Sequence, residues 1–113
     1  MPYPNDQGNP GAAIPVYVTS GSAPTFNDGS ATIPAATPTE VLPANASRRY
    51  LLIQCLTAGE DIWVNLFGGD AEPGITPSIK LTAGQTYESG PTVSNLAISI
   101  YSANGADVTV VEG

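Results

Sequence analysis

Proline and glycine recur so often in this chain that long helices are disfavoured throughout it. Eleven prolines and twelve glycines stand among its 113 residues, roughly one position in five. Proline removes a backbone donor and clashes with the preceding helical turn, while glycine costs backbone entropy inside a regular element. The chain is therefore expected to fold from short strands, turns and extended segments.

Short apolar runs follow one another after residue 30, separated by turn residues and without a useful helical period. The predicted strands cover residues 31–33, 40–42, 49–57, 61–67, 78–81, 85–88, 96–101 and 107–112. Many short strands at such spacing are typical of two packed antiparallel sheets. We therefore predict an all-β fold, an antiparallel β-sandwich or jelly roll formed by residues 31–113.

The strongest predicted strand, 49–57, is apolar on both faces. Its two faces would carry Leu51, Ile53 and Cys55 on one side and Tyr50, Leu52 and Leu56 on the other. This pattern indicates a central strand that is covered on both faces, or one that meets a partner with its second face.

Clean alternation marks the strand 61–67 and the last two strands. The residues expected on the core face are Ile62, Val64, Leu66, Leu96, Ile98, Ile100, Val108 and Val110. Trp63, Asn65 and Phe67 would then face away from the core. Two hairpin turns are predicted between neighbouring strands: Thr57–Glu60, and Asn104-Gly105, where a type I′ turn would need positive φ at both residues.

The first 30 residues differ from the rest in composition: they are rich in proline and poor in apolar runs. Prolines at positions 2, 4, 10, 15 and 24 prevent continuous pairing inside a sheet, and the segment contains one short apolar run at 14–18. We interpret residues 1–30 as an extended N-terminal arm, in which Val16, Tyr17 and Val18 add as a strand to a neighbour's sheet edge. The alternative is a solvated tail or linker.

The formal charge of −7 comes from ten acids and three bases, and those bases are Arg48, Arg49 and Lys80. A surface so acidic repels phosphates, so no nucleic-acid partner is expected. No apolar stretch reaches the length of a membrane span, and residues 1–6 do not resemble a secretory signal. We expect synthesis in the cytoplasm and no membrane partner.

The chain contains no histidine and a single cysteine. The usual general base, the histidine-dependent nucleophile arrangements and most transition-metal sites are therefore missing. We predict no catalytic, cofactor or metal residues, and no enzyme activity. Cys55 is expected to be a buried small hydrophobe. A calcium site at Asn65, Asp70 and Glu72 remains an alternative, because hard oxygen ligands gather there.

Aromatic residues are the main candidates for a contact surface. Trp63 and Phe67 share one expected outward face, and we expect Tyr87 and Tyr101 nearby. Such residues form either a subunit interface or a sugar-stacking platform, and the interface is favoured because exposed apolar patches usually meet protein. Arg48 and Arg49 would pair with acids across that interface, or stay solvated at the strand end.

The segments 47–54 (SRRYLLIQ), 61–69 (DIWVNLFGG) and 79–88 (IKLTAGQTYE), with the ends 98–102 and 108–113, resemble small tailed-bacteriophage virion proteins. Over residues 45–113 the pattern is similar to a capsid decoration, or cement, protein with a jelly-roll fold. This resemblance implies a structural protein on the outer capsid surface, with the major capsid protein as its partner.

We accordingly expect a homo-oligomer, a trimer in preference to a dimer, that stabilises contacts between capsid subunits. Two alternatives stay open. One is a carbohydrate- or receptor-binding domain of a tail or head fibre, and the other is a tail or connector assembly component.

Overall fold

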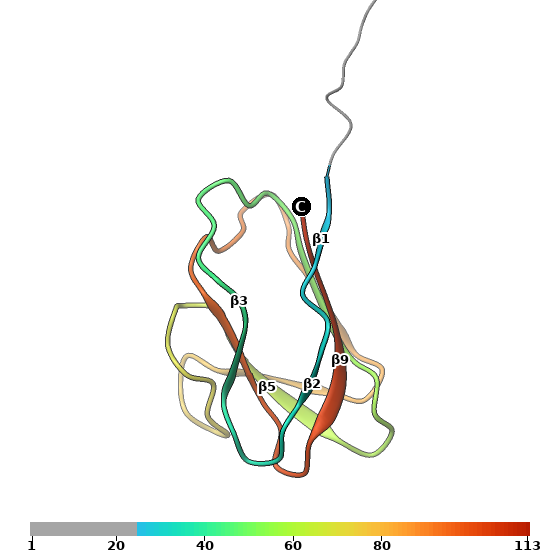
Figure 1. The fold of residues 1–113 in the computed structure, drawn as a ribbon. Coiled ribbons are helices and arrows are strands. Elements are labelled where there is room, and N and C mark those ends of the chain that lie inside the picture. Colours follow the sequence, from blue (N-terminus) through green and yellow to red (C-terminus); the bar gives the residue numbers. More distant parts are fainter. Residues whose placement is uncertain (1–24) are drawn as a thin grey trace, which may run out of the picture.

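The computed structural model describes residues 25–113, which form two antiparallel sheets facing each other across one apolar core (Figure 1). Within this range no residue is helical, so there is no helix long and apolar enough to cross a membrane. The strands are β1 (Asn27–Asp28), β2 (Ala31–Ile33), β3 (Thr39–Leu42), β4 (Leu51–Cys55), β5 (Asp61–Asn65), β6 (Ile79–Thr82), β7 (Thr86–Glu88), β8 (Ile98–Tyr101) and β9 (Ala106–Glu112).

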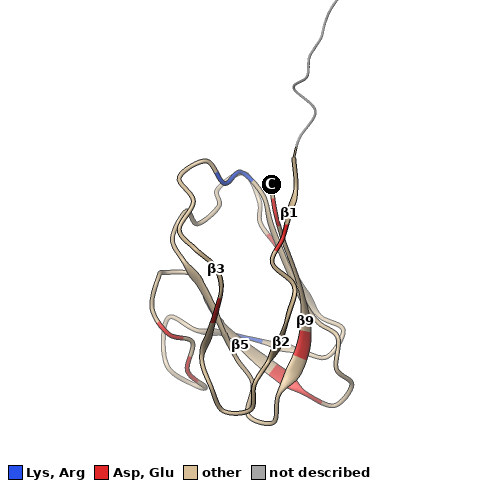
Figure 2. Cartoon of the chain, viewed as in Figure 1, with Lys and Arg blue, Asp and Glu red and all other residues tan. Residues whose placement is uncertain are grey.

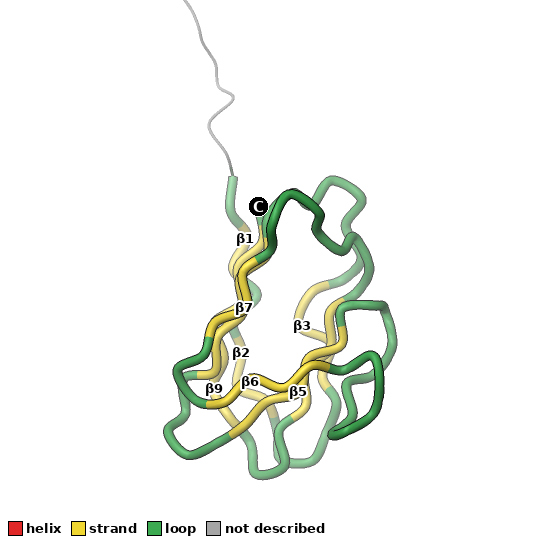
Figure 3. Tube along the Cα trace, turned by 180° about the vertical axis from the view of Figure 1, so that it is seen from behind, coloured by secondary structure: helices red, strands yellow, loops and turns green. Residues whose placement is uncertain are grey.

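The order of these strands confirms the predicted sandwich and gives it jelly-roll topology. One sheet has the order β1-β9-β4-β7, with β2 also paired to β9, and the other has the order β3-β8-β5-β6. From β2 onward every connection crosses from one sheet to the other, except that between β5 and β6. Figure 3 shows the two layers from behind, with β7 and β9 in one and β3, β5 and β6 in the other. The orders β2-β9-β4-β7 and β3-β8-β5-β6 are those of the eight strands of a jelly roll, and β1 adds a fifth strand to the first sheet.

Alternating apolar residues of both sheets fill the space between them. The buried core consists of Ile33, Leu42, Leu51, Ile53, Cys55, Ile62, Val64, Leu81, Ile98, Ile100, Ala106, Val108 and Val110. Two residues that were expected on the core face are not in the buried core: Leu66 is only partly buried and Leu96 is 43% exposed. Both lie beyond the ends of their strands, where the pleat no longer sets the side-chain direction.

β4 is central in its sheet, as predicted, with β9 on one side and β7 on the other. Its core face is buried, but Leu52 on the opposite face is half-buried and Leu56, just after the strand, is 56% exposed. Residues 25–113 therefore do not cover β4 on both faces.

The two predicted hairpins are wrong, although both turns exist. Thr57–Glu60 joins β4 to β5 and Asn104-Gly105 joins β8 to β9, and in each case the two strands belong to different sheets. Gly105 has a φ of 90°, but Asn104 does not have positive φ, so the turn is not type I′. Each turn arches over the edge of the core, and the strand partners come from distant parts of the sequence.

The expected boundary at residue 30 is also displaced. Asn27 and Asp28 already pair with Glu112 and Val111 of β9, and the Gly29 amide donates to the Val110 carbonyl at 2.8 Å. The sheet therefore begins inside the segment assigned to the arm. Val16, Tyr17 and Val18 lie outside the described residues.

Charge is distributed unevenly over the described chain. Figure 2 shows acids on both sheets and on several loops, whereas the two adjacent arginines lie at the end of the sandwich near the C-terminus. β1 lies at the same end of the sandwich, because it pairs antiparallel with the last residues of β9. This end of the sandwich holds the candidate site.

Candidate interaction surface

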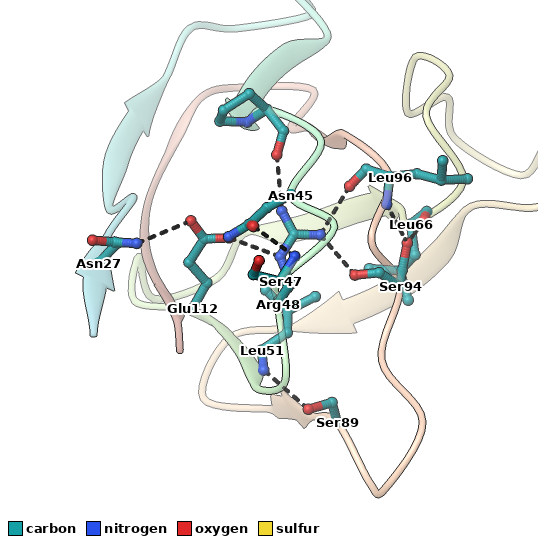
Figure 4. Close-up of polar contacts among 11 residues, drawn as sticks. Asn27, Asn45, Ser47, Arg48, Leu51, Leu66, Ser89, Ser94, Leu96 and Glu112 are labelled. Carbon is teal, nitrogen blue, oxygen red and sulfur yellow. Dashed lines mark hydrogen bonds and ion pairs between the residues drawn. The ribbon is translucent and has the colours of Figure 1, made fainter. Parts of the chain in front are cut away.

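Arg48 lies beneath this end of the molecule, and its side chain is fully buried. Its Nε donates to Glu112 Oε1 at 2.7 Å, and its Nη1 donates to the carbonyls of Ser94 and Leu96 at 2.7 and 2.9 Å (Figure 4). Its Nη2 donates to the Pro43 carbonyl at 2.9 Å. One guanidinium thus joins the chain before β4, the segment before β8 and the end of β9.

The expectation for Arg48 is therefore corrected. Its acidic partner is Glu112 of the same chain, and its side chain is neither solvated nor free for a second subunit. A buried guanidinium needs a paired carboxylate and acceptors for its remaining donors, and this site supplies both. Arg49, the next residue, is exposed.

Glu112 is held in its charged form. Burial acts to raise the pKa of this carboxyl, but hydrogen bonds from Arg48, Asn45 and Asn27, together with the Arg48 charge, outweigh burial and lower the pKa below its ordinary value. The Asn27 contact measures 3.3 Å between Nδ2 and Oε2. The pair therefore stays ionised at neutral pH.

The Arg48 contacts also fix the wall of an apolar groove. The Ser94 hydroxyl donates to the Leu66 carbonyl, and the Gly68 amide donates to the Ala97 carbonyl at 3.1 Å. These bonds hold the segment before β8 against the residues that follow β5. Between them lies a pocket of about 370 Å³ lined by Leu66, Phe67, Tyr87, Thr92, Val93, Ser94, Asn95 and Leu96. We call this the 67/96 groove.

The groove is open and its rim is apolar. Phe67 is 65% exposed and Leu96 is 43% exposed, so both present large apolar surfaces to water. A second hollow of about 370 Å³ shares Thr92, Val93 and Asn95 with the groove and is also lined by Arg48 and Arg49. Lys80 pairs with Asp61 and Arg48 with Glu112, so within residues 25–113 Arg49 is the one base without an ion pair.

The four predicted aromatic anchors separate into two pairs. Phe67 and Tyr87 line the groove, whereas Trp63 and Tyr101 are direct cross-strand partners on β5 and β8. Trp63 and Tyr101 are half-buried, and the Lys80 ammonium lies 5.8 Å from the centre of the Trp63 ring. We call Lys80, Trp63 and Tyr101, which occupy neighbouring strands, the aromatic row.

The loop between β5 and β6 explains this separation. It folds over the outer face of its sheet, where Ala71 is fully buried and its amide donates to Ser99 Oγ at 2.9 Å. Asn65, expected to face away from the core, is consequently only 4% exposed. Alternation assigns a residue to a face of the sheet, but it does not reveal a loop that covers that face.

The calcium alternative is not supported by the contacts of Asn65. Its Oδ1 accepts a hydrogen bond from the Phe67 amide at 2.7 Å, and its Nδ2 donates to the Asp70 carbonyl at 3.2 Å. Both polar atoms thus stabilise the loop. Within residues 25–113 no three His, Cys, Asp or Glu side chains gather to hold a metal ion.

Cys55 is buried, as predicted, and burial raises the pKa of its thiol. A protonated, enclosed thiol is a poor nucleophile, which fits a packing role.

Sequence reasoning did not single out Glu112, Val93 or Ser94 as site residues. A signal for Glu112 was present, because it follows Val108 and Val110 at period two and so occupies a core-facing position on β9. A carboxylate there requires a buried cation. Nothing local marks Val93 and Ser94, whose positions depend on the distant Arg48.

No family model matches this chain, and no curated protein matches it. Among solved structures, similarity is found to one from the work "Bacillus endospore appendages form a novel family of disulfide-linked pili". The identity is 13%, the match covers 86% of this chain and 91% of that chain, and the TM-score is 0.42.

Proposed function

We propose that this chain is a non-enzymatic virion protein that binds the outer surface of a tailed-phage capsid and stabilises contacts between capsid subunits. One observation carries the proposal: two separate apolar surfaces, the 67/96 groove and the aromatic row, lie on one acidic jelly roll. A protein that joins copies of itself to a lattice needs at least two such surfaces. The sequence pattern of residues 45–113, which resembles that of small tailed-phage virion proteins, is consistent with a structural role in the virion.

The groove has the properties of a docking surface. Its walls are held by the buried Arg48 contacts, so little conformational entropy is lost when a partner binds. Its exposed apolar rim gains free energy when water is excluded. We assign this groove to contacts between copies of the chain.

The aromatic row is assigned to the capsid. Trp63 and Tyr101 are of the residue types enriched at protein interfaces, and Lys80 adds a cation beside them. A homo-oligomer, which we propose to be a trimer, presents this row several times, so weak contacts to the major capsid protein add by avidity. Binding only to the assembled lattice stabilises that lattice. The formal charge of −7 on the whole chain disfavours binding to packaged nucleic acid.

Co-sedimentation tests this proposal. The purified chain is mixed with capsids assembled from the major capsid protein encoded in the same genome, and bound protein is measured in the pellet. We expect saturable binding that Trp63→Ser weakens at least tenfold. Leu56→Ser is the matched control, because Leu56 is 56% exposed, follows β4 of the other sheet and is not part of the aromatic row. Absence of binding by the unmodified chain contradicts the proposal.

The same row supports a second candidate, carbohydrate recognition by a phage fibre. Neighbouring half-exposed Trp and Tyr rings can stack on a sugar face. Quenching of Trp63 fluorescence by a glycan, without binding to capsids, favours this candidate over the first.

A further inference from the structure

The 67/96 groove lies at the end of the sandwich where the chain enters the first sheet. Phe26, just before β1, packs edge-on against Tyr50 with 5.8 Å between ring centres, and Tyr50 adjoins Arg49 of the second hollow. The preceding 24 residues are therefore attached near the groove. Val16, in the middle of the apolar run at 14–18, lies nine residues before Thr25, so a fully extended connection reaches about 30 Å, similar to the diameter of a small domain. This length suffices to reach a groove on an adjoining copy.

The composition of those 24 residues suits the groove. They contain one charged side chain, Asp6, and one apolar run at residues 14–18. Ile14, Val16 and Val18 recur at every second position, so in an extended segment they share a face. Such a segment offers apolar side chains to the groove, and its backbone carbonyls are acceptors for Arg49.

Charge favours this segment over the body of another copy as the occupant. Residues 25–113 hold nine acids against three bases, a formal charge of −6. Two such bodies repel each other at close range, whereas residues 1–24 carry a single acidic side chain. The nearly neutral segment can approach the acidic body with much less repulsion.

We propose that residues 14–18 of one copy dock in the 67/96 groove of a second copy and so link the copies in the oligomer. The inference rests on the proposed function for its role in assembly, but the docking itself requires no capsid. Its occupant is a defined segment of this chain, and the groove it fills consists of described residues.

Cross-linking between two full-length variants tests the docking. Chains carrying Val16→Cys are mixed with chains carrying Leu96→Cys and treated with a short bis-maleimide. Because the native Cys55 is buried, it contributes no background. We expect a product of twice the chain mass that is abundant in the mixture and scarce with either variant alone.

A control and two outcomes keep this test decisive. Ile75→Cys replaces Leu96→Cys in the control mixture, since Ile75 is 55% exposed and does not line the groove. Equal cross-linking in the two mixtures overturns the proposal. A Val16→Cys/Leu96→Cys double variant that cross-links within one chain, without a doubled mass, also overturns it, because the segment then docks in its own groove.

Sedimentation equilibrium separates this inference from the proposed function. Phe67→Ser and Val16→Ser should each weaken self-association at least tenfold, whereas Leu56→Ser should leave it unchanged. Self-association that depends on both residues, without capsid binding, supports the docking and refutes the capsid role. If the chain binds capsids but neither Phe67→Ser nor Val16→Ser changes its self-association, the docking is refuted and the capsid role is kept.

Discussion

At the scale of single residues, the buried pair of Arg48 and Glu112 has the largest consequences. The two side chains are 0% and 8% exposed, and the guanidinium also serves three carbonyls. Removing either partner leaves an uncompensated charge, and removing Arg48 also takes the donors from three partly buried hydrogen bonds to carbonyls. The pair therefore links the stability of the fold to the position of the groove wall.

Arg48→Met should lower the free energy of unfolding by about 3–5 kcal/mol, the usual cost of breaking a buried ion pair from one side. Urea denaturation measures this loss. Arg49→Met is the matched control, because an exposed neighbour should change stability by no more than about 0.5 kcal/mol. Equal effects at the two positions would show that burial of Arg48 is not stabilising.

The lowered pKa of Glu112 predicts acid sensitivity. Because the folded-state pKa lies below the ordinary value of 4.5, the carboxylate contributes stability that is fully present above pH 4.5. That contribution is lost as the pH falls through the folded-state pKa. Carboxyl-carbon NMR titration should place the pKa of Glu112 below 4.5, and the stability of Glu112→Gln should fall less steeply on acidification. A pKa at or above 4.5 contradicts this prediction.

At the scale of elements, the turns that cross between the sheets decide the topology. Gly84 and Gly105 both have positive φ, at 84° and 90°, but their surroundings differ. A Cβ at Gly84 would meet nothing within 4 Å, whereas one at Gly105 would lie 3.2 Å from the Ile33 carbonyl oxygen. The turn before β9 therefore passes close to the end of β2.

Alanine substitutions at Gly84 and Gly105 should separate the cost of the left-handed backbone conformation from the cost of a steric clash at the new Cβ. Gly84→Ala should cost about 1–2 kcal/mol for the left-handed conformation alone. Gly105→Ala should cost more, because the backbone of Ile33 must also shift. Urea denaturation of both variants measures the loss in the free energy of unfolding. Equal losses would mean that the backbone near Ile33 shifts without a measurable cost.

At the scale of the whole molecule, charge governs association. Residues 25–113 carry a formal charge of −6. Arg49, the one base in this range without an ion pair, lines the second hollow. Self-association should therefore tighten several-fold when NaCl is raised from about 20 mM to about 200 mM, because salt screens repulsion between bodies. Sedimentation equilibrium at both salt concentrations measures the change. Weaker association at high salt would instead indicate that ion pairs, such as one made by Arg49, hold the copies together.

The sequence by itself determined the fold class, the strand positions to within a few residues, the core faces of β4, β5 and β9, and the burial of Cys55. These follow from period-two alternation and from proline and glycine, which are properties of neighbouring residues. Tertiary structure alone decided which sheet each strand joins, because a tight turn looks the same whether it links paired strands or arches across the core. It also decided that Arg48 is buried by Glu112, 64 residues away, and that the β5–β6 loop separates Phe67 from Trp63. Those contacts join distant segments, and no local pattern encodes which distant segment will be the partner.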